Sequence, residues 1–246
     1  MIELNKIYCE DCLETMARMP DGYVDLIVTD PPYGLNYNNG DMASRWEAIF
    51  GGDVSKSIPR PIANDSEIEA NELFEEFLKE AKRILKPGCC CCCCGGGGGP
   101  KPLFANWTLL MDKYIGFKQA VVWDKPGLGM GHHYRRSYEF MLVAQKPGAA
   151  CIWNGGKNTS NILRIRKIIP RADQHPTEKP VELMAKFILL HSNENDIIYD
   201  PFCGHGSTLE AAIKYNRRWI GSEINPEYVK IAEKRIAPLL AQTRLF

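Results

Sequence analysis

"IIYDPFCGHGSTLEAA", residues 197–212, carries the pattern that decides the fold class. A short apolar run ends at Asp200, a Gly-x-Gly turn follows at Gly204 and Gly206, and a helical pattern begins at Ser207. Glycines at such a turn let the backbone approach a ligand, and open α/β sheets bind ligands at the carboxyl ends of their strands. The stretch lacks the third glycine of the dinucleotide fingerprint, and no P-loop lysine follows. We therefore predict a buried strand that leads into a ligand-binding turn and a helix.

A second acid follows the helix of this stretch. The run "RWIGSE" (218–223) predicts the next strand, and Glu223 stands at its end, 23 residues beyond Asp200. A carboxylate at such a strand end can accept hydrogen bonds from both hydroxyls of a ribose. The glycine turn alone would be a weak signal, but the turn and the second acid together predict a nucleoside site.

The other periodic segments alternate between strand and helix patterns. Ser66 and Glu69 form a capping box, Pro180 suits a first helical position, and Asn225 followed by Pro226 is typical of a helix start. We expect strands at 7–12, 24–29, 119–124, 137–146, 162–169, 196–200 and 218–223, and helices within 66–88, 179–192, 207–215 and 225–241. This alternation predicts an α/β fold with a mostly parallel sheet.

Composition limits the partners and the compartment. The 246 residues contain 30 Lys and Arg against 30 Asp and Glu, so no global field attracts nucleic acid or a membrane, and a polyanion would need a local patch. No apolar run approaches the 18 or so residues of a membrane span, which predicts a cytoplasmic protein without a membrane partner. Six of the ten cysteines are consecutive, and the other four suit a reducing compartment.

The tract "CCCCCCGGGGG" (89–99) is anomalous. It stands where an α/β sheet would place a strand, and cysteines are small and apolar enough to occupy one, but five glycines are poor strand material. Adjacent side chains on an extended chain point to opposite faces, so six in a row cannot converge on one metal ion. We expect no metal site here and treat the tract as a low-complexity segment that puts folding in doubt.

"DPPYG" (30–34) follows the expected strand at 24–29. The prolines fix φ and remove two N–H donors, so the Asp30 carboxylate and the Pro31 carbonyl form a patch of acceptors only. Such a patch suits a substrate amino group, and Tyr33 offers a face on which a planar ring can stack. An ordinary strand-to-turn connection would also explain the stretch, because Asp and Pro are common in turns.

The two motifs together resemble the S-adenosylmethionine-dependent DNA amino-methyltransferases, of the circularly permuted (beta) type in which the catalytic motif precedes the cofactor motif. The resemblance covers nearly the whole chain outside 89–99 and follows the family order through "VDLIVTDPPYG", "HPTEKPVELM", "YDPFCGHGSTLEAA" and "RWIGSEINPEYV". It implies one catalytic domain, 1–246, with a Rossmann-like, seven-stranded, mostly parallel sheet. His205 departs from the serine that is more usual at its position.

The resemblance also implies roles for individual residues. Asp30, Pro31, Pro32 and Tyr33 would form the catalytic clamp. Residues that would contact S-adenosylmethionine are Asp11, Asp30, Thr177, Lys179, Asp200, Phe202, Gly204, Gly206, Ser207 and Glu223. The clamp would hold the amino group of a flipped base in line with the methyl donor, with no metal and no covalent intermediate. Methylation of cytosine C5 typically needs a Pro-Cys nucleophile, and this sequence has no Pro-Cys pair.

An aspartate in the clamp favours adenine N6, because cytosine-N4 enzymes more often carry serine there. N4-cytosine or RNA methylation and a catalytically inactive nucleic-acid-binding relative stay open as alternatives. We expect double-stranded DNA to lie against basic residues in or near a target-recognition region at 127–171, although a solvated strand face would look the same. These residues are Arg135, Arg136, Lys157, Arg164, Arg166, Lys167 and Arg171. A homodimer and a cognate restriction nuclease are further candidate partners.

Overall fold

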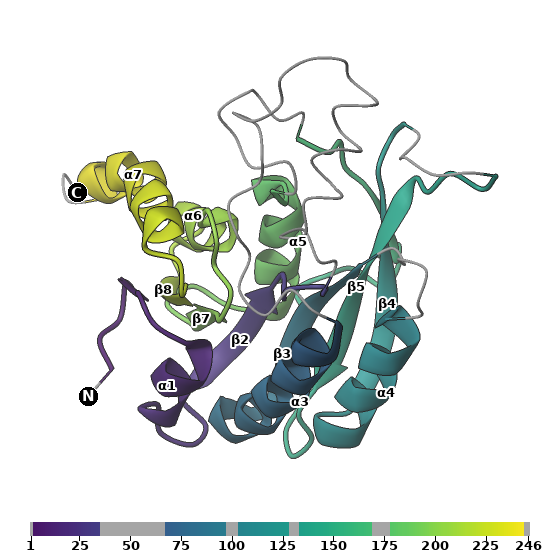
Figure 1. Ribbon diagram of the computed structural model, residues 1–246, viewed down its shortest axis with the longest axis horizontal. Helices are drawn as coiled ribbons and strands as arrows, with labels where there is room; N and C mark the ends of the chain where they lie inside the picture. The colour runs from purple at the N-terminus through teal and green to yellow at the C-terminus, as the bar shows by residue number, and fades with distance from the viewer. Residues whose placement is uncertain (1, 35–66, 97–102, 128–132, 169–177, 244–246) are drawn as a thin grey trace.

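The computed structural model describes residues 2–34, 67–96, 103–127, 133–168 and 178–243, and it contains one mixed, mostly parallel sheet covered by helices on both faces (Figure 1). The strand order is β1-β8-β7-β2-β3-β5-β4-β6. All neighbouring pairs are parallel except β3 with β5 and β5 with β4. The sheet therefore has eight strands where seven were expected, and the strand absent from the expected set is Leu85–Gly96, which contains the cysteine tract.

Strands and helices alternate through much of the chain as predicted, but the strand expected at 7–12 ends at Tyr8, and the helices Cys12–Ala17 and Leu103–Tyr114 were not among the expected elements. The strands are β1 (Lys6–Tyr8), β2 (Val24–Thr29), β3 (Leu85–Gly96), β4 (Phe117–Asp124), β5 (Tyr138–Gln145), β6 (Ile162–Arg164), β7 (Ile197–Asp200) and β8 (Arg218–Ser222). The helices are α1 (Cys12–Ala17), α3 (Glu67–Ile84), α4 (Leu103–Tyr114), α5 (Val181–His191), α6 (Ser207–Lys214) and α7 (Pro226–Thr243).

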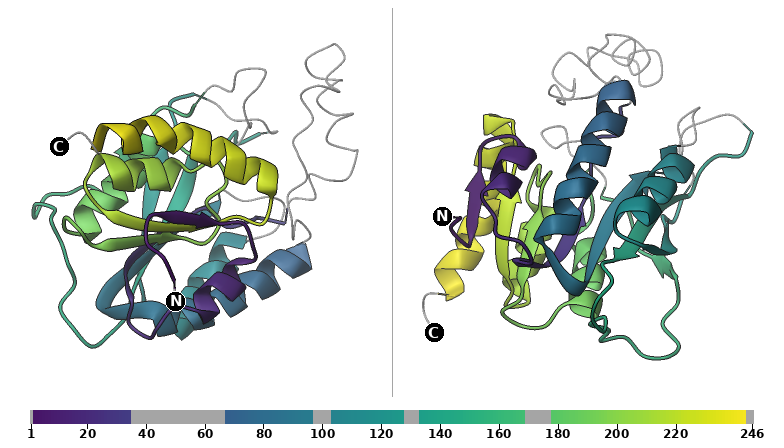
Figure 2. Two further views of the ribbon diagram at one scale, coloured as in Figure 1. Left: turned by 90° about the vertical axis from the view of Figure 1, so that its left-hand side faces the viewer. Right: turned by 90° about the horizontal axis from the view of Figure 1, so that it is seen from below.

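The helices divide into two groups that cover opposite faces of the sheet. Helices α5, α6 and α7 pack on one face, and α1, α3 and α4 pack on the other (Figures 1 and 2). The apolar stripe of α3 faces inward, with Phe74, Phe77 and Leu78 at most 1% exposed. Because a sheet covered on both faces buries both sides of each strand, β2 is buried at every residue.

The six consecutive cysteines lie in β3, in the middle of the sheet. This strand pairs with β2 and β5, and its cysteine side chains alternate between the two faces. Cys90, Cys92 and Cys94 pack toward α5 and α6, whereas Cys89, Cys91 and Cys93 pack toward α3 and α4. The cysteine part of the tract is therefore core in this structure, and residues 97–99 lie outside the described residues.

Several boundaries differ from the sequence expectation. β6 ends at Arg164, although the alternating pattern extended to 169, because only its first three residues pair with β4. Pro180 is the N-cap of α5 and not its first helical residue, since its ψ of 135° is extended. Asn225 caps α7 as expected and accepts a hydrogen bond from the Glu227 backbone N–H at 2.9 Å. Ser66 lies outside the described residues, so the capping box is not tested. No helix among the described residues has the length and apolar character needed to cross a bilayer.

Candidate active site

Four acidic residues follow four neighbouring strands at one edge of the sheet. Asp11, Asp30 and Glu223 come just after β1, β2 and β8, and Asp200 ends β7. Because β1, β8, β7 and β2 are adjacent and parallel, their carboxyl ends lie together. The topology thus brings together residues that lie more than 200 positions apart in the sequence.

The turn between β7 and α6 is held open by glycine. Gly204 has φ +46°, and nothing lies within 4 Å of the position that a Cβ would take there. Gly206 has φ +78°, and a Cβ there would lie 3.1 Å from the Ala232 Cβ of α7. The first glycine therefore borders open space, while the second allows the turn to pack against α7.

Glu223 fixes this turn from the neighbouring strand. Its Oε2 accepts a hydrogen bond from the Gly204 N–H at 3.0 Å, and its Oε1 accepts one from the Asn225 N–H at 2.8 Å. Burial raises the pKa of the Glu223 carboxyl, and the backbone hydrogen bonds oppose that effect. A carboxylate oxygen has two lone pairs, so each oxygen keeps acceptor capacity for a hydroxyl group.

Asp200 lies beneath the turn and is 3% exposed. Its Oδ1 accepts hydrogen bonds from Thr29 Oγ1 at 2.6 Å and from the Phe202 N–H at 3.2 Å. Burial raises the pKa of Asp200 to about 7, and these hydrogen bonds lower it in part. The bond to Thr29 joins the cofactor-motif strand β7 to β2, directly before Asp30.

Asp30 is held by two partners. Tyr33 Oη donates a hydrogen bond to Oδ1, and Lys179 Nζ lies 2.8 Å from Oδ2. Lys179 is 6% exposed, and neighbouring Asp30 and Glu139 raise the pKa of its ammonium group above its usual range despite the cost of burial. The same Nζ lies 5.3 Å from the centre of the Tyr33 ring, which itself stacks on Trp107. The carboxylate and the ring of the DPPY motif are therefore oriented before any substrate binds.

The structure adds residues that spacing did not single out. Glu139 of β5 lies between two lysines, with Lys125 Nζ 2.5 Å from Oε1 and Lys179 Nζ 3.5 Å from Oε2. Arg235 of α7 contacts Glu178 at 2.5 Å and also donates to the His205 backbone carbonyl at 3.0 Å. These contacts join segments far apart in the sequence, so no local pattern could have revealed them.

The other predicted site residues fall into three groups. Asp11 is the N-cap of α1, and its Oδ1 accepts a hydrogen bond from the Leu13 N–H at 2.8 Å. Pro31 is buried, while Pro32, Phe202 and Ser207 are partly exposed around the turn and the clamp. Thr177 and Arg171 lie outside the described residues.

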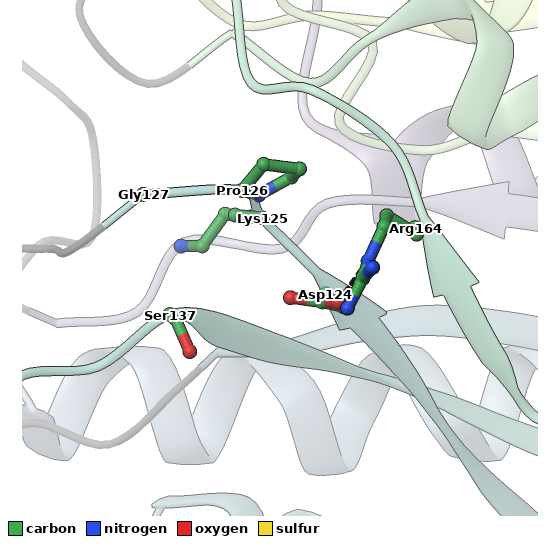
Figure 3. Close-up of a pocket in the computed structure, with 6 residues that line it drawn as sticks. All are labelled: Asp124, Lys125, Pro126, Gly127, Ser137 and Arg164. Atoms are coloured by element: carbon green, nitrogen blue, oxygen red, sulfur yellow. Dashed lines mark hydrogen bonds and ion pairs between the residues drawn. The ribbon is translucent and has the colours of Figure 1, made fainter.

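The basic residues lie on the side of the sheet that ends in β6. Arg135, Arg136, Lys157, Arg166 and Lys167 are exposed. Arg164 is paired, with Nε 2.7 Å from Asp124 Oδ2. This pair borders a cavity of about 420 Å³ that Lys125, Pro126, Gly127 and Ser137 complete (Figure 3). Lys125 lines this cavity and also pairs with Glu139, which in turn lies 3.5 Å from Lys179.

Comparison with known proteins decides the family. Residues 24–234 match the family described as DNA methylase, the N6/N4 class, and this range contains the clamp and the turn. The chain belongs to that family. It is therefore an S-adenosylmethionine-dependent amino-methyltransferase of the N6-adenine and N4-cytosine DNA group, and S-adenosylmethionine is its cofactor.

Individual relatives match along most of their length. The chain is 27% identical to the DNA adenine methyltransferase YhdJ of Escherichia coli, over 95% of this chain and 83% of that protein. Its fold resembles the M1.HpyAVI–S-adenosylmethionine complex with a TM-score of 0.67 at 23% identity, covering 94% of this chain and 98% of that one. The PvuII cytosine-N4-specific DNA methyltransferase has a TM-score of 0.70 at 19% identity, covering 97% and 92%.

The residues at the strand ends fit this cofactor. Open space borders Gly204, where the backbone can approach a ligand, and both Glu223 oxygens keep acceptor capacity at the end of the next strand. Burial raises the pKa of Asp200 to about 7, and a sulfonium cation nearby would favour its ionised form. The carboxylate acceptors and the open space at this edge of the sheet thus fit a cationic nucleoside.

Proposed function

We propose that this protein transfers a methyl group from S-adenosylmethionine to the exocyclic N6 of adenine in double-stranded DNA. The observation that carries the proposal is the Asp30 carboxylate, held by Tyr33 and by Lys179 at 2.8 Å, next to the carbonyl of Pro31. A flipped adenine presents an amino group with two N–H donors, and this pair of acceptors complements it. The name of YhdJ, a DNA adenine methyltransferase, supports adenine as the target.

The chain's own residues would position the reacting nitrogen. The cofactor supplies a methyl group on a positively charged sulfur, which is already a good leaving group. Asp30 and the Pro31 carbonyl would accept the two amino hydrogens, which favours a tetrahedral nitrogen and directs its lone pair toward the methyl group. Tyr33 would stack on the base, and its contact with Trp107 at 5.7 Å fixes the plane of its ring. The amino nitrogen would release one proton after it has been methylated.

Double-stranded DNA would lie on the basic side of the molecule. Arg135, Arg136, Lys157, Arg166 and Lys167 are exposed and belong to the stretch 127–171, which we assign to target recognition together with Arg164. The proposal also includes DNA binding by Arg171 and contact of Thr177 and the strand-end residues with S-adenosylmethionine. We propose with this role that the protein is located in the cytoplasm. Its further proposed partners are a second copy of the chain, in a homodimer, and a cognate restriction nuclease.

Cytosine N4 is the second candidate target. The fold resembles the cytosine-N4-specific PvuII enzyme at least as closely as M1.HpyAVI, but 19% identity carries no information on the base. The aspartate at position 30 favours adenine within this pair. RNA methylation and a catalytically inactive relative are outcomes that the experiment below separates.

The test is methyl transfer from labelled S-adenosylmethionine to unmethylated duplex DNA, followed by mass spectrometry of the nucleosides. We expect N6-methyladenine, and we expect Asp30→Ala to reduce its formation at least about 100-fold because the acceptor patch is lost. Asp21→Ala is the matched control, since Asp21 is 82% exposed, precedes β2 at the end opposite Asp30, and contacts only Arg83 of α3 among the ion pairs of the described residues.

Other products would change the conclusion. Detection of N4-methylcytosine would show that cytosine, and not adenine, is the target base. No labelled base, together with stabilisation by S-adenosylhomocysteine, would point to RNA or to another acceptor. If no base is labelled and S-adenosylhomocysteine does not stabilise the protein, we would conclude that the chain is an inactive relative.

A further inference from the structure

Three side chains outside the active site point toward one another. Cys90 lies in β3, Cys151 lies in the segment after β5, and His191 is the last residue of α5. The two sulfur atoms are 3.4 Å apart, and both sulfurs and a ring nitrogen of His191 lie within 4.8 Å of one another. Cys90 is 2% exposed and His191 is 8% exposed, so the cluster is built into the protein interior.

His191 has a buried ring nitrogen without a hydrogen-bond partner in the part of the chain that the structure describes. Among the described residues, no hydrogen bond reaches its Nδ1, although this atom is buried. A buried polar nitrogen without a partner costs free energy, and it is rare in folded proteins. The His191 ring also packs against Trp153, with ring centroids 5.3 Å apart, and stacks on Phe187. A metal ion bound by this imidazole would give it the partner that it lacks within the described ranges.

The helix adds a favourable field. His191 ends α5, where the carbonyl groups of the last turn carry partial negative charge. A cation beside this helix end is stabilised, whereas an anion would be repelled. The field therefore disfavours a phosphate or carboxylate ligand here, and it disfavours two thiolates unless a metal cation neutralises them.

The three segments are also fixed relative to one another. Asn154 joins the Cys151 segment to the end of α5, because its backbone N–H donates to the Leu190 carbonyl at 2.9 Å and its side-chain amide donates to the Ser192 carbonyl at 2.9 Å. The Lys146 N–H donates to the Cys89 carbonyl at 2.9 Å, which fixes the end of β5 beside the residue before Cys90. The cluster is thus preorganised by backbone contacts.

We propose that Cys90, Cys151 and His191 bind a zinc ion, with a water as the fourth ligand on the side of the partly exposed Cys151. Two thiolates and one imidazole are the ligand set that zinc prefers in proteins. Zinc–sulfur bonds of about 2.3 Å in a tetrahedral site place two sulfurs about 3.8 Å apart, close to the observed 3.4 Å. On binding, the two thiols release their protons to solvent and nothing is oxidised or reduced.

This site is separate from the clamp and uses the cysteine tract in a limited way. Cys94, four residues further along β3, is the cysteine that interacts with Asp30. Only Cys90 comes from the tract, so the site does not require adjacent cysteines to converge on one metal ion. A zinc ion here would brace the central strand against α5 and would not enter methyl transfer.

Cobalt binding tests the site. We expect the reduced full-length protein to bind one equivalent of Co²⁺, with thiolate-to-cobalt charge-transfer bands and the visible bands of a tetrahedral complex, and Zn²⁺ to displace it. Cys151→Ser and His191→Gln should each weaken binding at least about tenfold, since each removes one of three ligands. Cys9→Ser and His133→Gln are the matched controls, because both side chains are exposed and lie outside the cluster.

The result can overturn the proposal in either of two ways. If the wild-type protein, folded by circular dichroism, shows no tetrahedral cobalt spectrum, the site does not exist. If the spectrum and affinity survive in both Cys151→Ser and His191→Gln, the metal binds to other cysteines. Circular dichroism of the two variants separates lost ligands from lost folding, and a variant that is folded but does not bind supports the site.

Discussion

Asp200 illustrates at the residue scale how a cofactor motif can cost stability. Its carboxyl group is 3% exposed, and burial raises its pKa from an ordinary 3.8 to about 7. Thr29 and Phe202 supply hydrogen bonds that an amide oxygen could also accept. The negative charge itself is therefore unfavourable in the folded protein without cofactor, because buried carboxylates are poorly solvated.

This leads to a pH-dependent prediction for Asp200→Asn. Between pH 4 and 7 the folded wild-type protein binds more protons at Asp200 than the unfolded chain, so its free energy of unfolding falls as the pH rises through this window. The loss has an upper limit of about 4 kcal/mol, from about 3 units at 1.36 kcal/mol each. Asp200→Asn should remove this slope and unfold at higher urea concentration than wild type at pH 8. If the free energy of unfolding depends equally on pH in wild type and Asp200→Asn, the prediction is wrong. Asp21→Asn serves as the control at an exposed carboxylate.

Lys179 concentrates the charge of the clamp in one buried group. Its ammonium lies 2.8 Å from Asp30 and 3.5 Å from Glu139, and it is 6% exposed. Removing one member of a buried ion pair leaves a charge without compensation, which costs about 3–5 kcal/mol. The stability of the clamp and its orientation therefore depend on the same side chain.

Lys179→Met should lower the free energy of unfolding by about that amount and should also reduce methyl transfer. The measurement is urea unfolding together with turnover at a temperature where the variant is folded. Adding Asp30→Asn should restore part of the stability, because it removes the carboxylate that has lost its lysine partner, whereas Glu139 keeps its pair with Lys125. Lys79→Met is the control, since its pair with Glu76 is exposed, and it should leave the urea midpoint unchanged. A similar loss in both lysine variants would show that the burial of Lys179 is not the cause.

At the scale of elements, substitutions in the turn between β7 and α6 can distinguish an effect on cofactor binding from an effect on stability. Gly204 and Gly22 both have positive φ, +46° and +61°, and neither has an atom within 4 Å of its missing Cβ. They differ only in place, since Gly204 borders the candidate cofactor site and Gly22 precedes β2 at the opposite end of the sheet. The two glycines therefore form a matched pair.

Gly204→Ala and Gly22→Ala should each cost about 1–2 kcal/mol of stability, because an alanine at positive φ is strained. Only Gly204→Ala should weaken S-adenosylhomocysteine binding, since its methyl group would enter the space beside the ligand. Calorimetric titration and thermal unfolding measure the two effects. Equal affinity in both variants would place the cofactor elsewhere.

For the whole molecule, the ten cysteines report on the integrity of the core. Eight are buried, Cys151 is partly exposed, and Cys9 is exposed. Burial also raises the pKa of the Cys89 thiol to about 11, which lowers its thiolate fraction. Reaction of the other buried thiols requires opening of the sheet.

A thiol titration of the native, reduced protein should therefore show one fast thiol, a slower Cys151, and ten thiols after denaturation. Cys9→Ser should remove the fast phase only. Several fast thiols in the native state would mean that β3 is not paired as the central strand, which would overturn the fold described here.

The local pattern of the sequence determined most of the elements. The apolar stripe of α3, the Asn225 cap of α7 and the glycine turn after β7 are short-range features, and periodicity or capping chemistry specifies them directly. The order of motifs along the chain also indicated the family, because DPPY and the glycine turn each follow a buried strand. β6 was expected to be longer, since alternation continues beyond the residues that find a pairing partner.

Tertiary structure decided which side chains meet. Lys179 reaches Asp30 across 149 positions, and Asp200 reaches Thr29 across 171, because parallel strands return to the same edge after a helix. The network around Glu139 and the cluster of Cys90, Cys151 and His191 likewise join separate elements. Sequence patterns report on neighbours within one helix or strand, whereas contacts between elements depend on strand order and register. These properties are set only when the whole sheet packs.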